Sequence, residues 1–371
     1  MQYSFWEKDF LEKPADITIL GSGIVGLSTA ISIKKRAPHC NILVLERGTH
    51  PFGASTRNAG FACFGSVSEL LEDIRVMGEE ACMEVVSMRY QGLKTLRQRL
   101  GDATIDYRSC GGMEVFRMKD KESSEQCQGA TPFCNQLIKS ALGLDNCYNV
   151  VKNTSLPSFG AQAIFQNFEG TLHPLKMMHA LQKLAVSSGV RIEYGIQVDE
   201  IDQANRSLLC ANQLQIGYNK LIVCTNGFSR RLLPELEVVP ARNQVLITQP
   251  LPQNPLVSGY HLDKGFVYFR EVAGRILIGG GRNLDPEGEM TDQFGETEQI
   301  RNYLLKILDE IYPGASTKIE LSWSGILGVG PSKFPIVEWV DDHIIAGVRM
   351  GGMGVAIGSH LGEMLADQVT R

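Results

Sequence analysis

The sequence predicts an α/β protein in which a Rossmann-like parallel-sheet domain is interleaved with an α+β domain built on a mostly antiparallel sheet. Residues 16–46 read as strand, glycine turn, helix and strand, residues 244–281 contain three alternating strands, and residues 343–369 again read as strand, glycine turn and helix. Because the first and last patterns stand at opposite ends of the chain, we expect a discontinuous first domain. Its predicted segments are 1–80, 160–235 and 321–371, and those of the second domain are 81–159 and 236–320.

The first glycine turn carries a dinucleotide-binding fingerprint in its full context. In a G-x-G-x-x-G turn the first glycine makes the tight bend, the second lets the backbone approach a pyrophosphate, and the third allows close packing of helix on strand. The helix N-terminus offers free N–H groups and a positive dipole end to phosphates. An acid at the end of the next strand can accept hydrogen bonds from ribose hydroxyls. The predicted nucleotide site therefore contains Gly21, Ser22, Gly23, Ile24, Val25, Gly26, Glu46 and the adjacent Arg47.

Length and charge limit the classes of function. A chain of 371 residues exceeds the usual size of a single core, and a net charge of −5 without a basic block excludes a nucleic-acid partner. The uncharged run 17–33 contains three glycines and is read as a buried strand and helix, so no transmembrane segment is expected. The N-terminus lacks a signal pattern, and the nine cysteines form no CxxC pair. We therefore expect a cytoplasmic protein with reduced thiols and no metal site.

Further elements follow from capping and periodicity. Residues 49–65 read as a loop of small residues, and Ser66 with Glu69 forms a capping box ahead of helical spacing that continues to about residue 100. A short strand is expected over 113–117, while the cysteine-dotted stretch that follows gives no clear pattern. His173 precedes a helix-opening Pro174 and is read as a structural cap, and His360 within the terminal helix is read as a structural residue.

The later part of the chain alternates strands and helices. Strands are expected over 191–201, 220–227, 244–249, 266–271 and 275–281. Cysteines in or beside apolar strands, such as Cys224, are read as small core residues. An amphipathic helix presents one apolar face made of Ile300, Leu304, Ile307, Leu308 and Ile311.

These pieces in this order resemble the FAD-dependent oxidoreductases of the D-amino-acid oxidase superfamily, most closely the glycine oxidase, sarcosine oxidase and gamma-glutamylputrescine oxidase branch. The similarity covers 16–369 and is weakest between about 110 and 165. Three stretches carry it: the fingerprint with Glu46, the run GASTRNAGF over 53–61, and the run GGMGVAIGSHLGEML over 351–365.

The resemblance implies FAD, held along its whole length. A slot that carries a flavin-linking cysteine in sarcosine oxidase has none here, around Gly325, so the FAD is expected to be non-covalent. A glycine turn before the last helix would stabilise negative charge on the reduced flavin. The inferred FAD contacts are Ser55, Thr56, Arg57, Asn58, Ala59, Gly60, Phe61, Val198, Thr225, Asn226, Gly227, Gly325, Arg349, Gly351, Gly352, Met353, Gly354 and Val355.

By the same resemblance, the reaction is oxidation of the C–N bond of a small amine or amino acid by hydride transfer to flavin N5, which gives an imine that hydrolyses. The electron acceptor is O2 or another molecule, because the slot of an oxygen-activating lysine falls at Leu277 and leaves oxidase and dehydrogenase open. Alternatives are oxidation of a 2-hydroxy acid and a catalytically silent flavin-binding module. The sequence leaves the oligomeric state open, a homo-oligomer included.

The substrate side departs from the family. Carboxylate-binding members place a basic residue at slots that here hold Gly60, Leu327 and Ala356. The substrate is then either not a simple amino acid, or its acid is held by Arg270, Arg282 or Arg349. Tyr268 and Trp323 are expected to wall the pocket with aromatic faces. The predicted catalytic residues are Arg57, Tyr268, Arg270 and Arg349.

Overall fold

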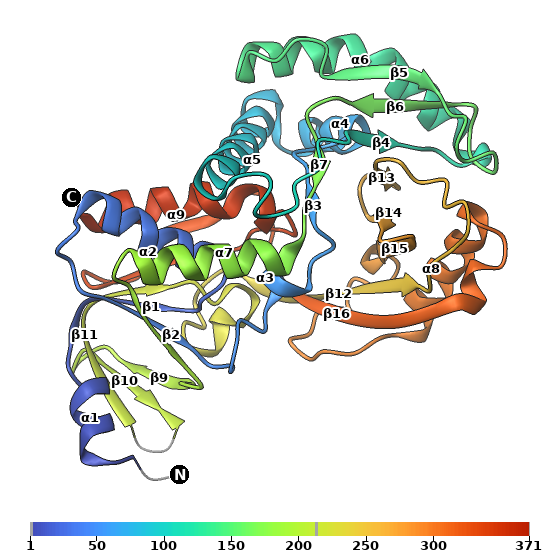
Figure 1. Cartoon of the computed structure of the whole chain (residues 1–371). Helices are drawn as coiled ribbons and strands as arrows, with labels where there is room; N and C mark the ends of the chain where they lie inside the picture. Colours follow the sequence, from blue (N-terminus) through green and yellow to red (C-terminus); the bar gives the residue numbers. More distant parts are fainter. Residues whose placement is uncertain (1–2, 212–213, 371) are drawn as a thin grey trace.

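The computed structural model describes residues 3–211 and 214–370 and contains two eight-stranded sheets and one two-stranded ladder. Figure 1 shows the first sheet under a layer of helices and the second sheet at the other end of the molecule. The predicted α/β class, with a Rossmann-like part and a mostly antiparallel second sheet, is confirmed. Among the described residues, no helix is long and apolar enough to cross a membrane.

The first sheet is the Rossmann-like part. Its strands run in the order β17, β18, β11, β1, β2, β8, all parallel except β17. The two apolar strands predicted within residues 16–46 form its buried centre, as expected for a parallel sheet covered on both faces. The strands of this order are β1 (Ala15–Leu20), β2 (Ile42–Glu46), β8 (Arg191–Tyr194), β11 (Leu214–Val223), β17 (Ile336–Trp339) and β18 (Ile344–Val348). Two further strands complete the eight, because β10 (Ser207–Cys210) pairs with β11 and β9 (Val198–Asp202) pairs with β10, both antiparallel.

Helices cover one face of this sheet (Figure 1). They are α2 (Ile24–Arg36), α7 (Pro174–Ser187) and α9 (Gly354–Thr370). α7 begins as predicted, with Pro174 in its first turn and the His173 side chain accepting a hydrogen bond from the Lys176 N–H. The opposite face is covered by β9 (Val198–Asp202), β10 (Ser207–Cys210) and α1 (Phe5–Leu11), which bury the other side of β2 and β11.

The second sheet runs in the order β16, β12, β15, β14, β13, β4, β6, β5, and every pair is antiparallel except β13 with β4. One face packs on α8 (Glu298–Ile311), whose five predicted apolar residues are all buried. The strands are β4 (Gly112–Glu114), β5 (Tyr148–Lys152), β6 (Gln162–Gln166), β12 (Val239–Thr248), β13 (Gly259–Leu262), β14 (Val267–Val272), β15 (Arg275–Gly280) and β16 (Ile319–Val329).

The remaining elements connect the two sheets. The ladder of β3 (Phe61–Ala62) and β7 (Gly170–Thr171) lies between them, followed by α4 (Val67–Met77) and α5 (Glu79–Leu100). α5 packs along α9, although the sequence assigned α5 to the second domain, because Gly92 allows its backbone to meet that of Ala356. The division of the chain into domains stays a prediction.

One element lies in a stretch without a sequence-based expectation, and several local expectations are wrong. A helix of 22 residues, α6 (Lys121–Leu142), occupies the stretch that showed no clear pattern. The single strand expected over 191–201 is broken at Gly195, where φ is +73°. The predicted loop contains a one-turn helix, α3 (Ala54–Arg57). Ser66 caps α4 through the Glu69 N–H, but the Glu69 carboxylate pairs with Arg89 and does not complete a capping box.

Candidate active site

An elongated cavity runs along the carboxyl ends of the parallel strands, the edge at which open α/β sheets bind ligands. The residues that directly follow β1, β2 and β11 contribute to its lining, as does Met350, the second residue after β18. The described lining consists of Leu20, Gly21, Gly23, Ile24, Val25, Leu45, Glu46, Arg47, Pro51, Phe52, Gly53, Ala54, Ser55, Asn58, Ile196, Gln197, Val198, Asp199, Cys224, Thr225, Asn226, Phe228, Arg231, Leu232, Ile326, Leu327, Met350, Gly352, Gly354 and Val355.

The fingerprint turn has the close approaches that its glycines predict. Gly21 has φ +98°, and a Cβ there would lie 3.0 Å from the carbonyl oxygen of Cys224. A Cβ on Gly26 would lie 2.0 Å from the carbonyl oxygen of Gly21, so any side chain would push α2 off the turn. The bare backbone of this turn thus forms a cradle at one end of the cavity.

The loop after β2 completes the N-terminus of α2. The Ser55 hydroxyl accepts a hydrogen bond from the Ile24 N–H at 3.0 Å, which leaves the next first-turn N–H groups, of Val25 and Gly26, without intrahelical acceptors. The Asn58 amide donates to the carbonyls of Ala54 and Ser55, and its oxygen accepts from the Gly60 N–H. These hydrogen bonds fix the conformation of the loop and its position at the N-terminus of α2.

Glu46 fixes the turn to the end of β2. One carboxylate oxygen accepts from the Ser22 N–H and hydroxyl at 3.1 and 2.9 Å, and the other accepts from the Gly48 N–H at 3.0 Å. Ser22 is fully buried by this contact, whereas Glu46 also lines the cavity. The predicted ribose ligand is thus a fixed carboxylate beside the glycine cradle.

Positive charge collects on the same stretch of the cavity. The Arg47 guanidinium stacks 4.0 Å from the centre of the Phe228 ring, and Arg231 approaches the same ring while bonding to Asp292. Burial lowers the pKa of Arg47, and the nearby Arg231 lowers it further. Among the described residues, no carboxylate lies within ion-pair distance of Arg47, so an anionic ligand would relieve this charge.

The cradle, the free helix N–H groups and Arg47 together fit the adenosine and pyrophosphate of a dinucleotide, and the cavity continues to the glycine turn before α9. Of the predicted cofactor residues, fourteen line the cavity: Gly21, Gly23, Ile24, Val25, Glu46, Arg47, Ser55, Asn58, Val198, Thr225, Asn226, Gly352, Gly354 and Val355. The others lie outside this lining: Ser22, Gly26, Thr56, Arg57, Ala59, Gly60, Phe61, Gly227, Gly325, Arg349, Gly351 and Met353.

Sequence reasoning missed lining residues that directly flank predicted ones. Cys224, expected to be a core residue, is buried and also lines the cavity beside Thr225. Phe228, Arg231 and Leu232 follow the same turn on a 3₁₀ helix, η3 (Asn226–Arg231). Extending each predicted turn by one helical turn would have found most of them.

The second sheet presents an aromatic face beside this cavity. Tyr268 on β14 and Trp323 on β16 lie on the face opposite α8, together with Phe61 from the ladder. The Phe61 and Tyr268 rings meet edge-on at 5.3 Å, and the Tyr268 hydroxyl accepts a hydrogen bond from the Asn243 amide at 2.8 Å. Burial raises the pKa of Tyr268, so its phenol stays protonated at neutral pH.

Arg57 and Arg270 hold the predicted FAD loop onto this face. Arg270 donates to the carbonyls of Ala59 and Leu172 at 2.7 and 3.1 Å, and burial lowers its pKa to about 10. Arg57 donates to the carbonyl of Ser324, and its guanidinium packs against the Phe52 and Phe294 rings, which also contact each other. Both guanidinium groups therefore have donors committed to backbone oxygens.

Arg349 lies apart from these groups. Its guanidinium donates to the carbonyls of Phe334 and Glu237, both at 3.0 Å, and its own N–H donates to the Asn226 side chain. Its φ is +66°, a conformation that these contacts stabilise. The contacts favour a structural role, in which Arg349 positions the glycine turn before α9.

Arg282 differs from the other arginines. It begins a short 3₁₀ helix, η4 (Arg282–Leu284), directly after β15, and its guanidinium lies 5.7 Å from the centre of the Phe266 ring. Burial lowers the pKa of Arg282. The positive charge of Arg282 lowers the pKa of Tyr268, but the larger effect of burial raises it. Among the described residues, its guanidinium has no hydrogen-bond acceptor and no ion-pair partner.

Comparisons with known proteins agree with this geometry. Residues 16–368 match the family model described as FAD dependent oxidoreductase. Gamma-glutamylputrescine oxidoreductase of Escherichia coli (strain K12) is 25% identical over 377 residues, which cover 95% of this chain and 83% of that protein.

Two solved structures share the fold over nearly the whole chain. The structure of L-proline dehydrogenase from P. horikoshii has a TM-score of 0.76 at 16% identity and covers 97% of this chain and 94% of its own. The structure of glycine oxidase from Geobacillus kaustophilus has a TM-score of 0.72 at 18% identity and covers 96% of this chain and 95% of its own. At such identities the likeness concerns the fold alone.

Proposed function

Because this chain belongs to the family of FAD-dependent oxidoreductases, we propose that it oxidises the C–N bond of an amine that also carries a carboxylate, with Arg282 as the group that binds the carboxylate. The substrate loses a hydride from the carbon next to nitrogen and becomes an imine, which water hydrolyses. FAD supplies the two-electron acceptor. The chain itself contributes orientation, charge and exclusion of water.

Arg282 is the observation that carries this proposal. Arg270 and Arg349 each donate to two backbone carbonyls, so moving either toward a substrate acid would leave buried carbonyls unpaired. Arg282 would lose no hydrogen bond on binding a substrate, and its planar guanidinium can donate two parallel hydrogen bonds to a carboxylate. An unpaired guanidinium next to Tyr268 thus compensates for the missing basic residues at the family's usual slots.

The aromatic face supports an amine-bearing substrate. Phe61, Tyr268 and Trp323 offer apolar surface on which the carbon skeleton can pack, and aromatic faces attract a substrate ammonium. The related proteins named above include a gamma-glutamylputrescine oxidoreductase and a glycine oxidase, whose names indicate amine and amino-acid substrates. The ammonium loses a proton to solvent before the hydride is transferred, because only the neutral amine reacts, so no protein base is required.

Anaerobic reduction of the bound flavin tests the reaction class. The panel pairs each amino acid with the amine that lacks its carboxylate and with the 2-hydroxy acid that lacks its nitrogen. We expect amino acids to bleach the flavin, the decarboxylated amines to do so with weaker binding, and the hydroxy acids to leave the spectrum unchanged. Bleaching by hydroxy acids alone would overturn the proposal, and a flavin that nothing reduces would favour the silent binding module.

Arg282→Met tests the carboxylate ligand. It should raise the dissociation constant of the amino acid about 10- to 100-fold while leaving that of the matched amine nearly unchanged, since one charge-assisted contact contributes about 1.5–3 kcal/mol. Arg275→Met is the control, because Arg275 begins the strand β15 that leads to Arg282 but pairs with Glu320 at the surface. Equal effects on the two substrates would contradict the assignment of Arg282.

A further inference from the structure

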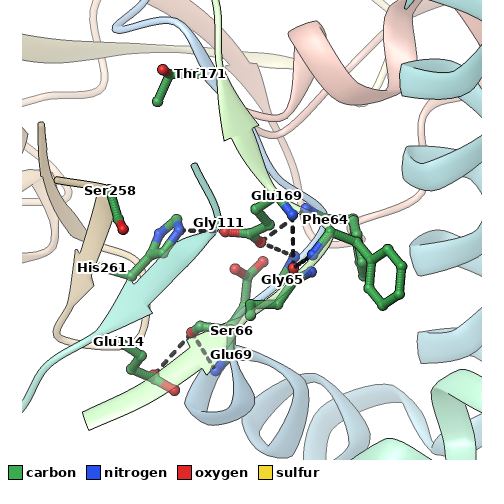
Figure 2. A network of polar contacts seen from close by, with 12 residues as sticks. Phe64, Gly65, Ser66, Glu69, Gly111, Glu114, Glu169, Thr171, Ser258 and His261 are labelled. Atoms are coloured by element: carbon green, nitrogen blue, oxygen red, sulfur yellow. Dashed lines mark hydrogen bonds and ion pairs between the residues drawn. The ribbon is translucent and has the colours of Figure 1, made fainter. Parts of the chain in front are cut away.

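Three potential metal ligands meet between the β3–β7 ladder and the second sheet. They are Cys63, Glu169 and His261, and their ligand atoms all lie within 4.8 Å of one another. Glu169 and His261 are buried, with the His261 Nε2 and a Glu169 carboxylate oxygen 2.8 Å apart. Figure 2 shows these two side chains pointing toward one another across the network.

The fold brings these residues together from distant parts of the sequence. Phe61 pairs with Thr171 and Ala62 with Gly170, so the next positions along the ladder are Cys63 and Glu169. His261 comes from β13 of the second sheet and is 92 residues away from Glu169 in the sequence. Such separations leave no motif, which explains why the sequence predicted no metal site.

We propose that Cys63, Glu169 and His261 form a binding site for one divalent transition-metal ion of the zinc class. A thiolate, an imidazole and a carboxylate are the ligands that such ions share, whereas magnesium and calcium require oxygen ligands. Three protein ligands leave a fourth position for water or a small-molecule donor. The site is independent of the proposed amine oxidation.

The distances are compatible with an ion after a small relaxation. With Zn–N and Zn–O bonds of about 2.1 Å and tetrahedral angles, the ligating nitrogen and oxygen stand about 3.4 Å apart. The His261 and Glu169 atoms would therefore separate by roughly 0.6 Å from their hydrogen-bonded distance of 2.8 Å. The Cys63 sulfur lies within 4.8 Å of the other two ligand atoms and would move closer to them when the ion binds.

The surroundings fix the carboxylate ligand and make room for it. The second oxygen of Glu169 accepts from the N–H groups of Phe64 and Gly65, which follow Cys63 directly, at 3.3 and 3.5 Å. A Cβ on Gly112 would lie 2.0 Å from the Glu169 carboxylate, so only glycine leaves this space free. Contacts of this kind, which orient a ligand from behind, are common at metal sites.

Charge balance also favours an ion. The neighbouring carboxylates are already committed, since Glu69 pairs with Arg89 and Glu114 accepts from Ser66 and Ser68. Glu169 is the carboxylate directed at the cluster.

Metal content tests the site directly. The full-length protein with its FAD, purified without a metal-binding tag, is treated with chelator, loaded with ZnCl2, desalted and analysed by mass spectrometry for metals. We expect one zinc ion per chain and one sulfur ligand per zinc in the X-ray absorption spectrum at the zinc edge. Fewer than about one ion per ten chains after loading, or zinc without a sulfur ligand, would show that the cluster is only an ion pair beside a neutral thiol.

Two variants assign the ligands. Cys63→Ser and His261→Gln should each weaken zinc binding at least about 10-fold, and Cys63→Ser should remove the sulfur signal. The controls are Cys110→Ser and His343→Gln, whose side chains lie outside the cluster and should retain full zinc content. Unchanged zinc binding in Cys63→Ser would overturn the proposal, and the wild-type absorption spectrum decides even if a variant fails to fold.

Discussion

At the scale of single residues, Glu289 shows how a buried charge ties a loop to the second sheet. Its carboxylate accepts two hydrogen bonds from Arg242, both at 2.9 Å, and further bonds from Gln244 and Thr297. Burial alone would raise the pKa of Glu289, but these donors outweigh it and hold the pKa below its ordinary value. The pair connects β12 to the segment that leads into α8.

Glu289→Gln should lower the free energy of unfolding by about 3–5 kcal/mol at pH 7, because Arg242 would keep a buried charge without a partner. A carboxylate whose pKa is depressed in the folded state stabilises the protein above its unfolded pKa and loses this effect as pH falls through the folded value. The difference between the two proteins should therefore shrink below about pH 4.5, the ordinary glutamate value. Urea unfolding between about pH 3 and pH 8 measures it.

The exposed Glu287 in the same segment provides the control. Glu287→Gln should change the free energy of unfolding by less than about 0.5 kcal/mol. An equally small effect of Glu289→Gln would contradict the prediction. It would mean that the attraction within the ion pair only compensates for the free energy of removing the two charges from water.

Residue types were predictable from the sequence, but their partners were not. Arg57, Arg270, Arg282 and Arg349 look alike in the sequence, and three of them donate to backbone carbonyls whereas the guanidinium of Arg282 has no such partner among the described residues. These carbonyls come from segments far away in the chain. Neither spacing nor composition could therefore distinguish an arginine that bonds to the backbone from one that is free to bind a substrate. His173 was predictable as a cap because its partner is only three residues away.

At the scale of elements, the contact between α5 and α9 depends on a single missing side chain. A Cβ on Gly92 would lie 2.0 Å from the carbonyl oxygen of Ala356 and 3.1 Å from the Cα of Ile357, and both are backbone atoms. The first turn of α9 carries Gly354 and Val355, which line the cofactor cavity. Helix packing at Gly92 thus bears on the position of the cofactor site.

Gly92→Ala should lower the free energy of unfolding by about 1–3 kcal/mol, because backbone atoms cannot move aside as a flexible side chain can. It should also weaken FAD binding through the shift of α9. Gly129→Ala is the matched control, since Gly129 lies within α6 with nothing within 4 Å of its added Cβ. The control should gain up to about 1 kcal/mol from helix propensity. Chemical unfolding and FAD titration measure both, and equal behaviour of the two variants would contradict this account of the packing.

Elements with a strong period were predictable, and those without one were not. The fingerprint strand and helix, α7 and α8 match because caps and apolar spacing agree along each of them. α6 was missed because it contains Gly129 and Pro132 within a largely polar stretch, which local propensity disfavours. Its buried face is defined by tertiary contacts around Cys127, Cys134 and Ile138.

At the scale of the whole molecule, the cofactor cavity is assembled from four separated parts of the chain. Its lining comes from 20–58, 196–199, 224–232 and 326–355. The sequence predicted the turns of each part, because glycine patterns and strand ends are local signals. It could not predict how the aromatic face of the second sheet stands beside them, since that depends on the packing of the two sheets.

The composition of this lining leads to a last prediction, that the FAD is bound without a covalent bond. Attachment of a flavin to protein requires a nucleophilic side chain within reach, and Cys224 is the one cysteine or histidine in the described lining. Its carbonyl lies against Gly21 in the fingerprint turn, the part of the cavity predicted to bind adenosine and pyrophosphate, and burial raises the pKa of its thiol to about 12. A protonated thiol at that end of the cavity is a poor nucleophile.

Acid precipitation should therefore release intact FAD and leave a colourless pellet with the unmodified mass of the polypeptide. FAD added back to the refolded apoprotein at about 100 times its dissociation constant should raise the free energy of unfolding by about 2.7 kcal/mol. A yellow pellet, or a peptide carrying the mass of the flavin, would contradict the prediction and identify the attachment residue.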